Sequence, residues 1–258
     1  MRGLYIHIPF CIKKCKYCDF TSYTGCSDVF GRYITEMANE MEKYRDEAID
    51  TVFIGGGTPT IFSPLQLAVL LKNIRDIFKI SPSAEVTIES NPKTLTEEKL
   101  SVLKKGGVNR ISIGVQSFNN NELKMIGRVH NENDAEKAIR LSQKCGFSNI
   151  NLDIMFSLPG QTKESFRYTL EKAIKLNPTH ISCYSLILEE HTPLYDEVIS
   201  GEVKLCDEEQ DRLLYEYACN FFAQKGLMQY EISNFARRGY ECRHNLKYWN
   251  CDEYIGIG

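Results

Sequence analysis

The order of apolar segments predicts an α/β protein, an open and incomplete barrel of six β/α units followed by a C-terminal extension. Short strand-like runs alternate with longer helix-like segments along most of the 258 residues. Connections of this length favour parallel strands with crossover helices over an antiparallel sheet. The expected strands cover residues 3–8, 50–54, 84–90, 110–116, 149–156 and 180–186, and the expected helices cover residues 28–47, 64–79, 96–105, 132–145 and 163–176.

Three of these strands alternate apolar and polar residues, which predicts a polar interior on one face of the sheet. The apolar sets are Ala84, Val86 and Ile88, then Ile111, Ile113 and Val115, then Ile150, Leu152 and Ile154. The opposite faces carry Glu85, Thr87 and Glu89, then Ser112, Gly114 and Gln116, then Asn151, Asp153 and Met155. A closed eight-stranded barrel fills its interior with branched apolar side chains. We therefore expect an open barrel that holds a large polar ligand.

The repeating pattern indicates a core over residues 1–190 and an extension over residues 191–258. The extension contains an amphipathic helix near residues 207–225 and then a less regular segment. The chain stops on "YIGIG", a glycine-bearing apolar run. We expect further residues to follow this run in the native protein.

Composition excludes several classes of protein. The formal net charge is -3, with acidic and basic residues interspersed, so no basic stripe indicates nucleic-acid binding. No run of about 18 apolar residues predicts a transmembrane helix, and the N-terminus lacks a signal-peptide core. A cytoplasmic location is expected, where ten cysteines are not expected to form a disulfide framework.

Three of the cysteines cluster immediately after the first expected strand. Cys11, Cys15 and Cys18 lie on a loop at the carboxyl end of that strand, where βα loops build active sites. Three thiolates on a [4Fe-4S] cluster leave the fourth iron open to a chelating ligand. A structural zinc site is the alternative, but it usually needs a second pair of ligands, and the nearest further thiol, Cys26, stands alone.

The loop also carries three lysines, Lys13, Lys14 and Lys16. They either offset the negative charge of a cluster or lie in solvent, and the sequence favours neither interpretation.

The Cys-x3-Cys-x2-Cys spacing, with Tyr17 before the last cysteine, resembles the signature of radical S-adenosylmethionine (SAM) proteins. "GGGTPT", which begins at Gly55, follows the second strand and resembles the family's glycine motif for SAM. Glycines suit such a position because they permit close approach of a ligand to the backbone. The resemblance implies a [4Fe-4S] cluster on the three cysteines, and SAM contacts from Tyr5, Tyr17, Gly56, Gly57, Thr58, Glu89, Gln116, Arg128 and Asp153.

Further motifs identify a branch of this family. "LYIHIPFC", "ESNP", "GVQSF", "GRVH" and "LPGQT" resemble the coproporphyrinogen-oxidase-like branch over essentially the whole chain. The oxidase, HemN, carries a further cysteine two positions beyond the third, where this chain has Phe20. "HNLKYW", residues 244–249, resembles a haem-binding motif of the haem chaperones of the HemW group. His244 is thus a candidate haem ligand; alternatively, it is a buried hydrogen-bonding residue.

The resemblance therefore implies a HemW-like haem chaperone, with haem or a porphyrin, a haem-acceptor protein and an electron donor as partners. It also implies that residues 191–258 continue into a further C-terminal domain. The alternative is an oxygen-independent oxidase that converts coproporphyrinogen III to protoporphyrinogen IX. A structural zinc protein without redox chemistry is the third interpretation. No catalytic residue beyond the cluster and the SAM site is assigned.

Overall fold

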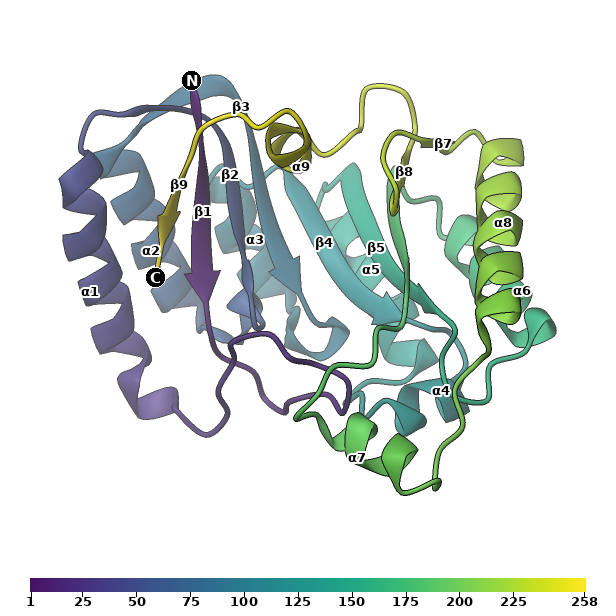
Figure 1. The fold of residues 1–258 in the computed structure, drawn as a ribbon. Coiled ribbons are helices and arrows are strands. Elements are labelled where there is room, and N and C mark those ends of the chain that lie inside the picture. Colours follow the sequence, from purple (N-terminus) through teal and green to yellow (C-terminus); the bar gives the residue numbers. More distant parts are fainter.

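A computed structural model describes residues 1–258, whose strands form one nine-stranded sheet in the order β7-β8-β6-β5-β4-β3-β2-β1-β9 (Figure 1). The six expected strands run parallel to one another, so the prediction of a parallel β/α core is confirmed. They are β1 (Arg2–Ile8), β2 (Ala48–Gly56), β3 (Lys79–Ser90), β4 (Arg110–Gln116), β5 (Asn149–Phe156) and β6 (His180–Ser185).

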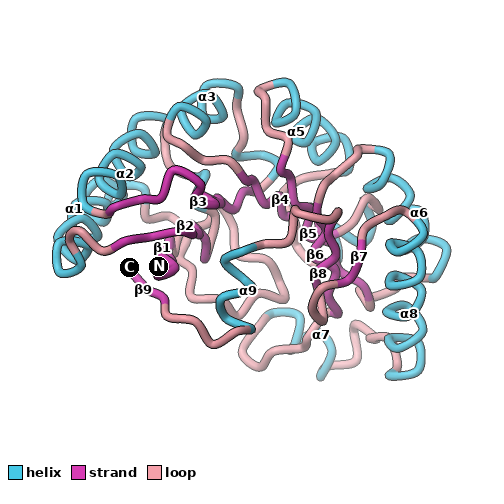
Figure 2. The backbone as a smooth tube through the Cα atoms, turned by 90° about the horizontal axis from the view of Figure 1, so that it is seen from above, coloured by secondary structure: helices cyan, strands magenta, loops and turns pink.

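The helices cover mainly the outer face of the curved sheet. Figure 2 shows α1, α2, α3, α5, α6 and α8 along the convex side, and α9 on the concave side. The helix bounds are α1 (Phe30–Met41), α2 (Pro64–Ile77), α3 (Glu97–Lys105), α4 (Asn120–Met125), α5 (Glu132–Lys144), α6 (Lys163–Lys175), α7 (Pro193–Ile199), α8 (Glu208–Gln224) and α9 (Arg243–Trp249). The sheet is thus an open barrel whose inner side is not filled by helices.

Local signals in the sequence explain where several helices begin. Ser63 and Gln66 form a reciprocal capping box at the start of α2, with a proline in its first turn. Similar boxes start α5 at Asn131 and α6 at Thr162. The sequence predicts the first helix over residues 28–47, but α1 covers only Phe30–Met41. The flanking residues Ser27–Val29 and Glu42–Tyr44 form 3-10 turns instead.

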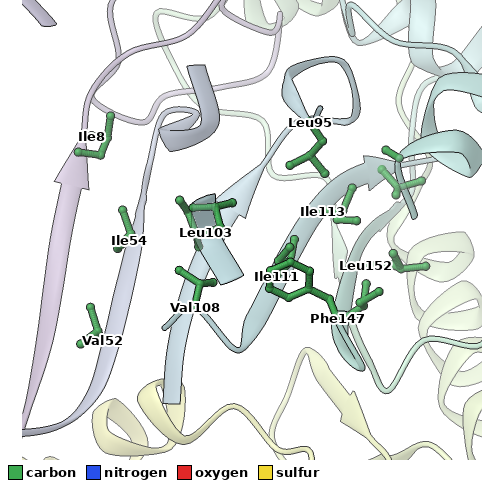
Figure 3. Close-up of a cluster of buried hydrophobic side chains, with 14 of the residues drawn as sticks. Ile8, Val52, Ile54, Leu95, Leu103, Val108, Ile111, Ile113, Phe147 and Leu152 are labelled. Carbon is green, nitrogen blue, oxygen red and sulfur yellow. The ribbon is translucent and has the colours of Figure 1, made fainter. Parts of the chain in front are cut away.

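The apolar core lies between the sheet and the outer helices (Figure 3). The apolar residues of the alternating strands, such as Ile111, Ile113 and Leu152, face this layer and are fully buried. Leu103 of α3 and Phe147 before β5 meet them from the helical side. Because successive strand residues point to opposite faces, this packing directs the polar set of residues to the concave side.

The segment after residue 190 adds strands at both edges of the sheet. β8 (Asn234–Ala236) pairs antiparallel with β6, and β7 (Met228–Gln229) pairs with β8. β9 (Tyr254–Ile257) pairs parallel with β1, so the apolar run at the end of the chain is a strand. None of the helices has the length and apolar character needed to cross a membrane.

Candidate functional site

A cavity of about 410 Å³ lies on the concave side of the sheet. Its walls include all of the site residues expected from the sequence except Tyr5 and His244. Those on the walls are Cys11, Cys15, Tyr17, Cys18, Gly56, Gly57, Thr58, Glu89, Gln116, Arg128 and Asp153. The polar interior predicted from strand alternation is thus present, with Ser112, Asn151 and Met155 on the same walls.

Backbone hydrogen bonds to neighbouring segments hold the cysteine loop in place. The Cys11 amide donates to the Tyr23 carbonyl over 2.9 Å, and the Tyr23 amide donates to the Pro9 carbonyl over 2.7 Å. The Lys16 amide donates to the carbonyl of Ile126, just after α4, over 3.1 Å. The Lys16 carbonyl accepts from the Leu194 amide of α7. Two short helices absent from the sequence prediction therefore position this loop.

The three thiols are free and half-buried, and two of them have polar partners across the cavity. Arg128 Nη1 lies 3.3 Å from Cys15 Sγ, and Thr58 Oγ1 lies 3.5 Å from Cys11 Sγ. Burial raises the pKa of the Cys18 thiol, and the Cys15 sulfur adds to this shift. The Arg128 guanidinium is suited to stabilise a Cys15 thiolate by a charge-assisted hydrogen bond.

The lysines of the loop have different environments. Lys16 Nζ pairs with Glu197 of α7 over 2.5 Å, so its charge has a protein partner. Lys14 Nζ donates to the Phe20 carbonyl, and Lys13 is exposed. Lys13 and Lys14 both border the cavity. Only these two lysines are therefore free of carboxylate partners beside the thiols.

The glycine turn after β2 packs directly against the backbone of the cysteine loop. The Gly57 amide donates to the Ile8 carbonyl over 2.8 Å, and the Thr58 amide donates to the Phe10 carbonyl over 2.7 Å. A Cβ atom at Gly57 would lie 2.6 Å from the Phe10 carbonyl oxygen. Gly56 has a φ of 108°, which side-chain-bearing residues rarely adopt. These glycines are thus required by close approach and by backbone conformation.

Two carboxyl groups face the cavity from β3 and β5, which lie on either side of β4 in the sheet. Glu89 accepts a hydrogen bond from the Gly56 amide over 3.0 Å, and Asp153 accepts one from Asn151 Nδ2 over 2.6 Å. Burial raises the pKa of Glu89 to about 8, and repulsion by Asp153 contributes to this shift. Burial also raises the pKa of Asp153. Near neutral pH, the protonated carboxyl group of Glu89 can therefore donate a hydrogen bond to a polar ligand.

Gln116 ends β4 in a left-handed conformation. Its φ is 65°, and the pairing register with β5 shifts between Gly114 and Gln116. Its Oε1 accepts a hydrogen bond from the Tyr184 hydroxyl over 3.1 Å. A bulge of this kind redirects a side chain at the end of a strand. Here it turns the amide into the cavity wall beside Arg128, which contacts the Gly114 carbonyl.

Tyr5 and His244 lie next to the cavity but not on its walls. The Tyr5 hydroxyl hydrogen-bonds to His7 Nδ1 over 3.0 Å. His244 is fully buried, with Nδ1 2.9 Å from Thr51 Oγ1 and Nε2 2.9 Å from the Tyr248 hydroxyl. Burial, reinforced by the nearby Lys247, lowers the pKa of His244 to about 4, so its imidazole is neutral. Both ring nitrogens are engaged within the protein, and an iron ligand at this position would have to displace one of these hydroxyls.

Several further residues on the cavity walls were not among the expected site residues, although Ser112 and Asn151 were expected on the polar faces. The walls also include Arg110, Ser112, Asn151, Ser182, Tyr184 and Asn245. The first five lie on the alternating polar faces of β4, β5 and β6, and the same alternation that places Ser112 and Asn151 there also places Arg110, Ser182 and Tyr184. Asn245 lies on α9, a helix that only the tertiary structure places against the sheet.

The arrangement fits a thiolate-bound iron–sulfur cluster with a polar ligand beside it. The thiols are soft donors, and the adjoining glycine turn permits close approach to the backbone. Arg128 Nε is buried without a hydrogen-bond partner, and the Glu89 and Asp153 carboxyl groups face the same space. No group of three His, Cys, Asp or Glu side chains is arranged around a point that could hold a single metal ion.

Comparisons with known proteins agree with this geometry. The radical SAM superfamily matches residues 5–173. The heme chaperone HemW of Bacillus subtilis is 42% identical over all of this chain and 69% of its own length, and the HemW of Escherichia coli is 39% identical over 99% and 68%. The structure of Escherichia coli coproporphyrinogen III oxidase (HemN) superposes with a TM-score of 0.84 at 26% identity, covering 99% of this chain and 63% of that one.

The chain thus spans about two thirds of the length of these relatives. The curated HemW proteins align at higher identity than the oxidase structure, and they do so over nearly every residue of this chain. On the family match, the curated relatives and the open barrel, this chain belongs to the radical SAM superfamily and, within it, to the HemW family.

Proposed function

We propose that this chain forms the radical SAM core of a haem chaperone, which binds a [4Fe-4S] cluster, SAM and haem and transfers the haem to an acceptor protein. The observation that carries the proposal is the convergence of three free thiols with the Gly56 turn, Glu89, Arg128 and Asp153 on one cavity. The curated relatives are named heme chaperones, and we therefore propose haem as the ligand that is transferred.

Membership of the radical SAM superfamily implies the cluster and SAM as cofactors. We assign the cluster to Cys11, Cys15 and Cys18, and SAM to the cavity walls beside them. Bound there, the two groups supply one-electron reduction chemistry. The protein's own contribution is to position them: Arg128 stabilises the Cys15 sulfur, and Glu89 and Asp153 hold polar groups of the ligand.

A second, smaller apolar cluster excludes water from one side of the cavity. Ile126, Met155, Leu158, Leu186 and Leu194 are buried together, with Tyr17 and Tyr184 packed against them. This cluster links the ends of β5 and β6 to α7 and to the cysteine loop. It shields one side of the cavity, which strengthens the electrostatic interactions inside it.

The oxidase activity of HemN is the second candidate, because that enzyme shares the fold of the whole chain. Phe20 helps to distinguish the chaperone from the oxidase. It borders the cavity, and its side chain is 65% exposed. A phenyl ring cannot supply the thiol that the oxidase resemblance requires at this position. We therefore favour the chaperone, and we infer a cytoplasmic setting and an unidentified electron donor.

One experiment separates the two functions. The full-length protein is reconstituted anaerobically with iron and sulfide and incubated with SAM, a reductant and coproporphyrinogen III, while a parallel sample is titrated with haem. We expect haem binding by absorbance and no protoporphyrinogen in the product analysis. Vinyl-group formation at the rate expected of an enzyme would refute the chaperone function.

The same titration tests His244 as the haem ligand. His244→Ala should alter the haem spectrum if the imidazole is an axial ligand. Because His244 is buried against Phe53 and Thr51, the matched control is Thr51→Ala, which removes the same hydrogen bond and keeps the imidazole. An equal spectral change in both variants would assign His244 a structural role instead.

A further inference from the structure

Arg110 is a buried cation whose interactions within the protein are incomplete. It is the first residue of β4, only 2% exposed, and it borders the cavity on the concave side of the sheet. Its guanidinium forms no hydrogen bond or ion pair with another side chain, and its enclosed Nε atom has no partner. A buried charge without partners is costly unless a bound group compensates for it.

The carboxylates nearest to Arg110 are committed to other donors. Glu85 accepts hydrogen bonds from the backbone amides of Arg243 and His244, each over 3.1 Å, at the start of α9. Asp153 accepts from Asn151 and from Ser112. Burial acts to lower the pKa of Arg110, but the nearby acidic groups, with Cys242 and Glu85 foremost, together raise that pKa, so the guanidinium keeps its charge.

A second donor borders the same cavity. Asn245 lies on α9, directly after His244, and its side-chain amide makes no hydrogen bond within the protein. In the motif "HNLKYW", the asparagine therefore borders the cavity, whereas the histidine is bonded to Thr51 and Tyr248. In Figure 1, α9 lies near the amino end of β1, opposite the loop that follows β1 and carries the cysteines. Arg110, at the amino end of β4, belongs to the same end of the cavity.

A guanidinium and an amide together suit a carboxylate. The planar fork of arginine binds both oxygens of a carboxylate or of a phosphate, and an amide N–H group adds a further donor. The neighbouring Glu85 and Asp153 disfavour a doubly charged phosphate at this position more than a singly charged carboxylate. The chemistry of the site thus favours a carboxylate.

We propose that Arg110 and Asn245 form a carboxylate subsite that anchors a carboxylate side chain of a tetrapyrrole ligand. The inference rests on the proposed haem function, and it assigns a role to the end of the cavity remote from the cysteine loop. Recognition here is independent of the iron, because it uses the ligand's side chain and not its metal.

The test compares protoporphyrin IX, which is iron-free and carries two carboxyl groups, with its dimethyl ester, in which both are blocked. Fluorescence titration of the full-length, reconstituted protein should show tighter binding of the diacid, by about tenfold or more for a charge-assisted contact. Arg110→Gln and Asn245→Ala should each reduce this preference while leaving the affinity for the ester unchanged. The matched control is Arg140→Gln, which removes an exposed guanidinium paired with Glu136 on α5.

The possible outcomes separate the carboxylate subsite from the proposed haem function. Equal binding of diacid and ester by the wild type, or an unchanged preference in both variants, would overturn the carboxylate subsite while leaving porphyrin binding intact. Failure of the wild type to bind either compound, although it binds haem, would overturn the subsite alone; failure to bind haem as well would overturn both the subsite and the haem function. Circular dichroism and thermal unfolding establish that Arg110→Gln is folded. If it is not, Asn245→Ala decides alone, because this half-buried residue makes no side-chain bond that the fold needs.

Discussion

At the scale of single residues, the raised pKa of Glu89 makes the stability of the protein depend on pH. Its carboxyl group has a pKa of about 8 in the folded protein and an ordinary value of 4.5. Between these pH values the folded state holds a proton that the unfolded chain has released. The free energy of unfolding therefore decreases as pH rises from 4.5 to 8, by at most about 1.4 kcal/mol per pH unit from this group.

Glu89→Gln should flatten this decrease, because glutamine carries no titrating proton. Urea denaturation of the protein without its cluster, at pH 5, 6, 7 and 8, measures the slope. Asp153, whose pKa burial also raises, leaves a residual slope of the same sign. Glu202→Gln, at an exposed position, is the control and should follow the wild type. Parallel curves for wild type and Glu89→Gln would mean that Glu89 is ionised throughout this range.

The cysteines allow an equally direct test of the cluster. Cys11→Ala, Cys15→Ala and Cys18→Ala should each abolish a four-iron cluster, because we propose these three thiolates as the protein's full set of cluster ligands. Cys26→Ala should retain it, since the Cys26 thiol donates to the Thr24 carbonyl in the same loop region and lies off the cavity walls. Iron and sulfide analysis after anaerobic reconstitution decides this. Zinc without iron in every preparation would contradict the cluster assignment.

At the scale of elements, the turn between β2 and the 3-10 segment at Pro59–Ile61 is fitted against the cysteine loop. A methyl group at Gly57 would approach the backbone of Phe10, at 2.6 Å from its oxygen and 2.8 Å from its nitrogen. A backbone neighbour cannot rotate away as a side-chain end can. Any side chain at Gly57 must therefore separate the turn from the loop that carries the thiols.

We expect Gly57→Ala to destabilise the protein by about 1–3 kcal/mol and to weaken SAM binding. Gly31→Ala provides a control of opposite sign. Gly31 lies exposed in α1 with no heavy atom within 4 Å of an added Cβ, so alanine should stabilise that helix by up to ~1 kcal/mol. Thermal unfolding and calorimetric titration with SAM measure the two effects. A Gly57→Ala protein as stable as the wild type would show that the turn has room to adjust.

At the scale of the whole molecule, the segment after residue 190 adds strands to both edges of the same sheet. β9 covers the edge strand β1, and β8 covers β6 at the other side. Without β9, the β1 backbone would present unpaired hydrogen-bonding groups at an open edge. The last residues of the chain thus support the strand that leads into the cysteine loop.

Ile257→Ala should therefore lower the free energy of unfolding by about 2–5 kcal/mol, the range for a buried isoleucine. Its side chain is 2% exposed and packs in the main core cluster. Leu65→Ala, at a side chain that is 74% exposed, should change stability by no more than ~0.5 kcal/mol. Denaturant unfolding of both variants provides the comparison. Equal stabilities would mean that β9 is dispensable for the core.

The six parallel strands, the six main helices and the polar interior could be predicted because each depends on a local pattern. Alternation along β3, β4 and β5 assigns residues to one face or the other, and a buried sheet leaves no freedom in that choice. The short helices α4, α7 and α9 could not be found in this way. They contain six or seven residues each, and in segments so short, contacts with the rest of the chain outweigh intrinsic helix propensity.

The sequence by itself determined which residues could act on a cluster and on SAM, because thiol spacing and strand periodicity are encoded locally. The tertiary structure decided which of them share a cavity. It brought Cys11, Glu89, Arg128 and Asp153 together, since parallel strands place their carboxyl ends at one edge. It also bonded His244 to Thr51 and left Asn245 facing the cavity, because only the docking of α9 against the sheet settles which side of that helix is inside.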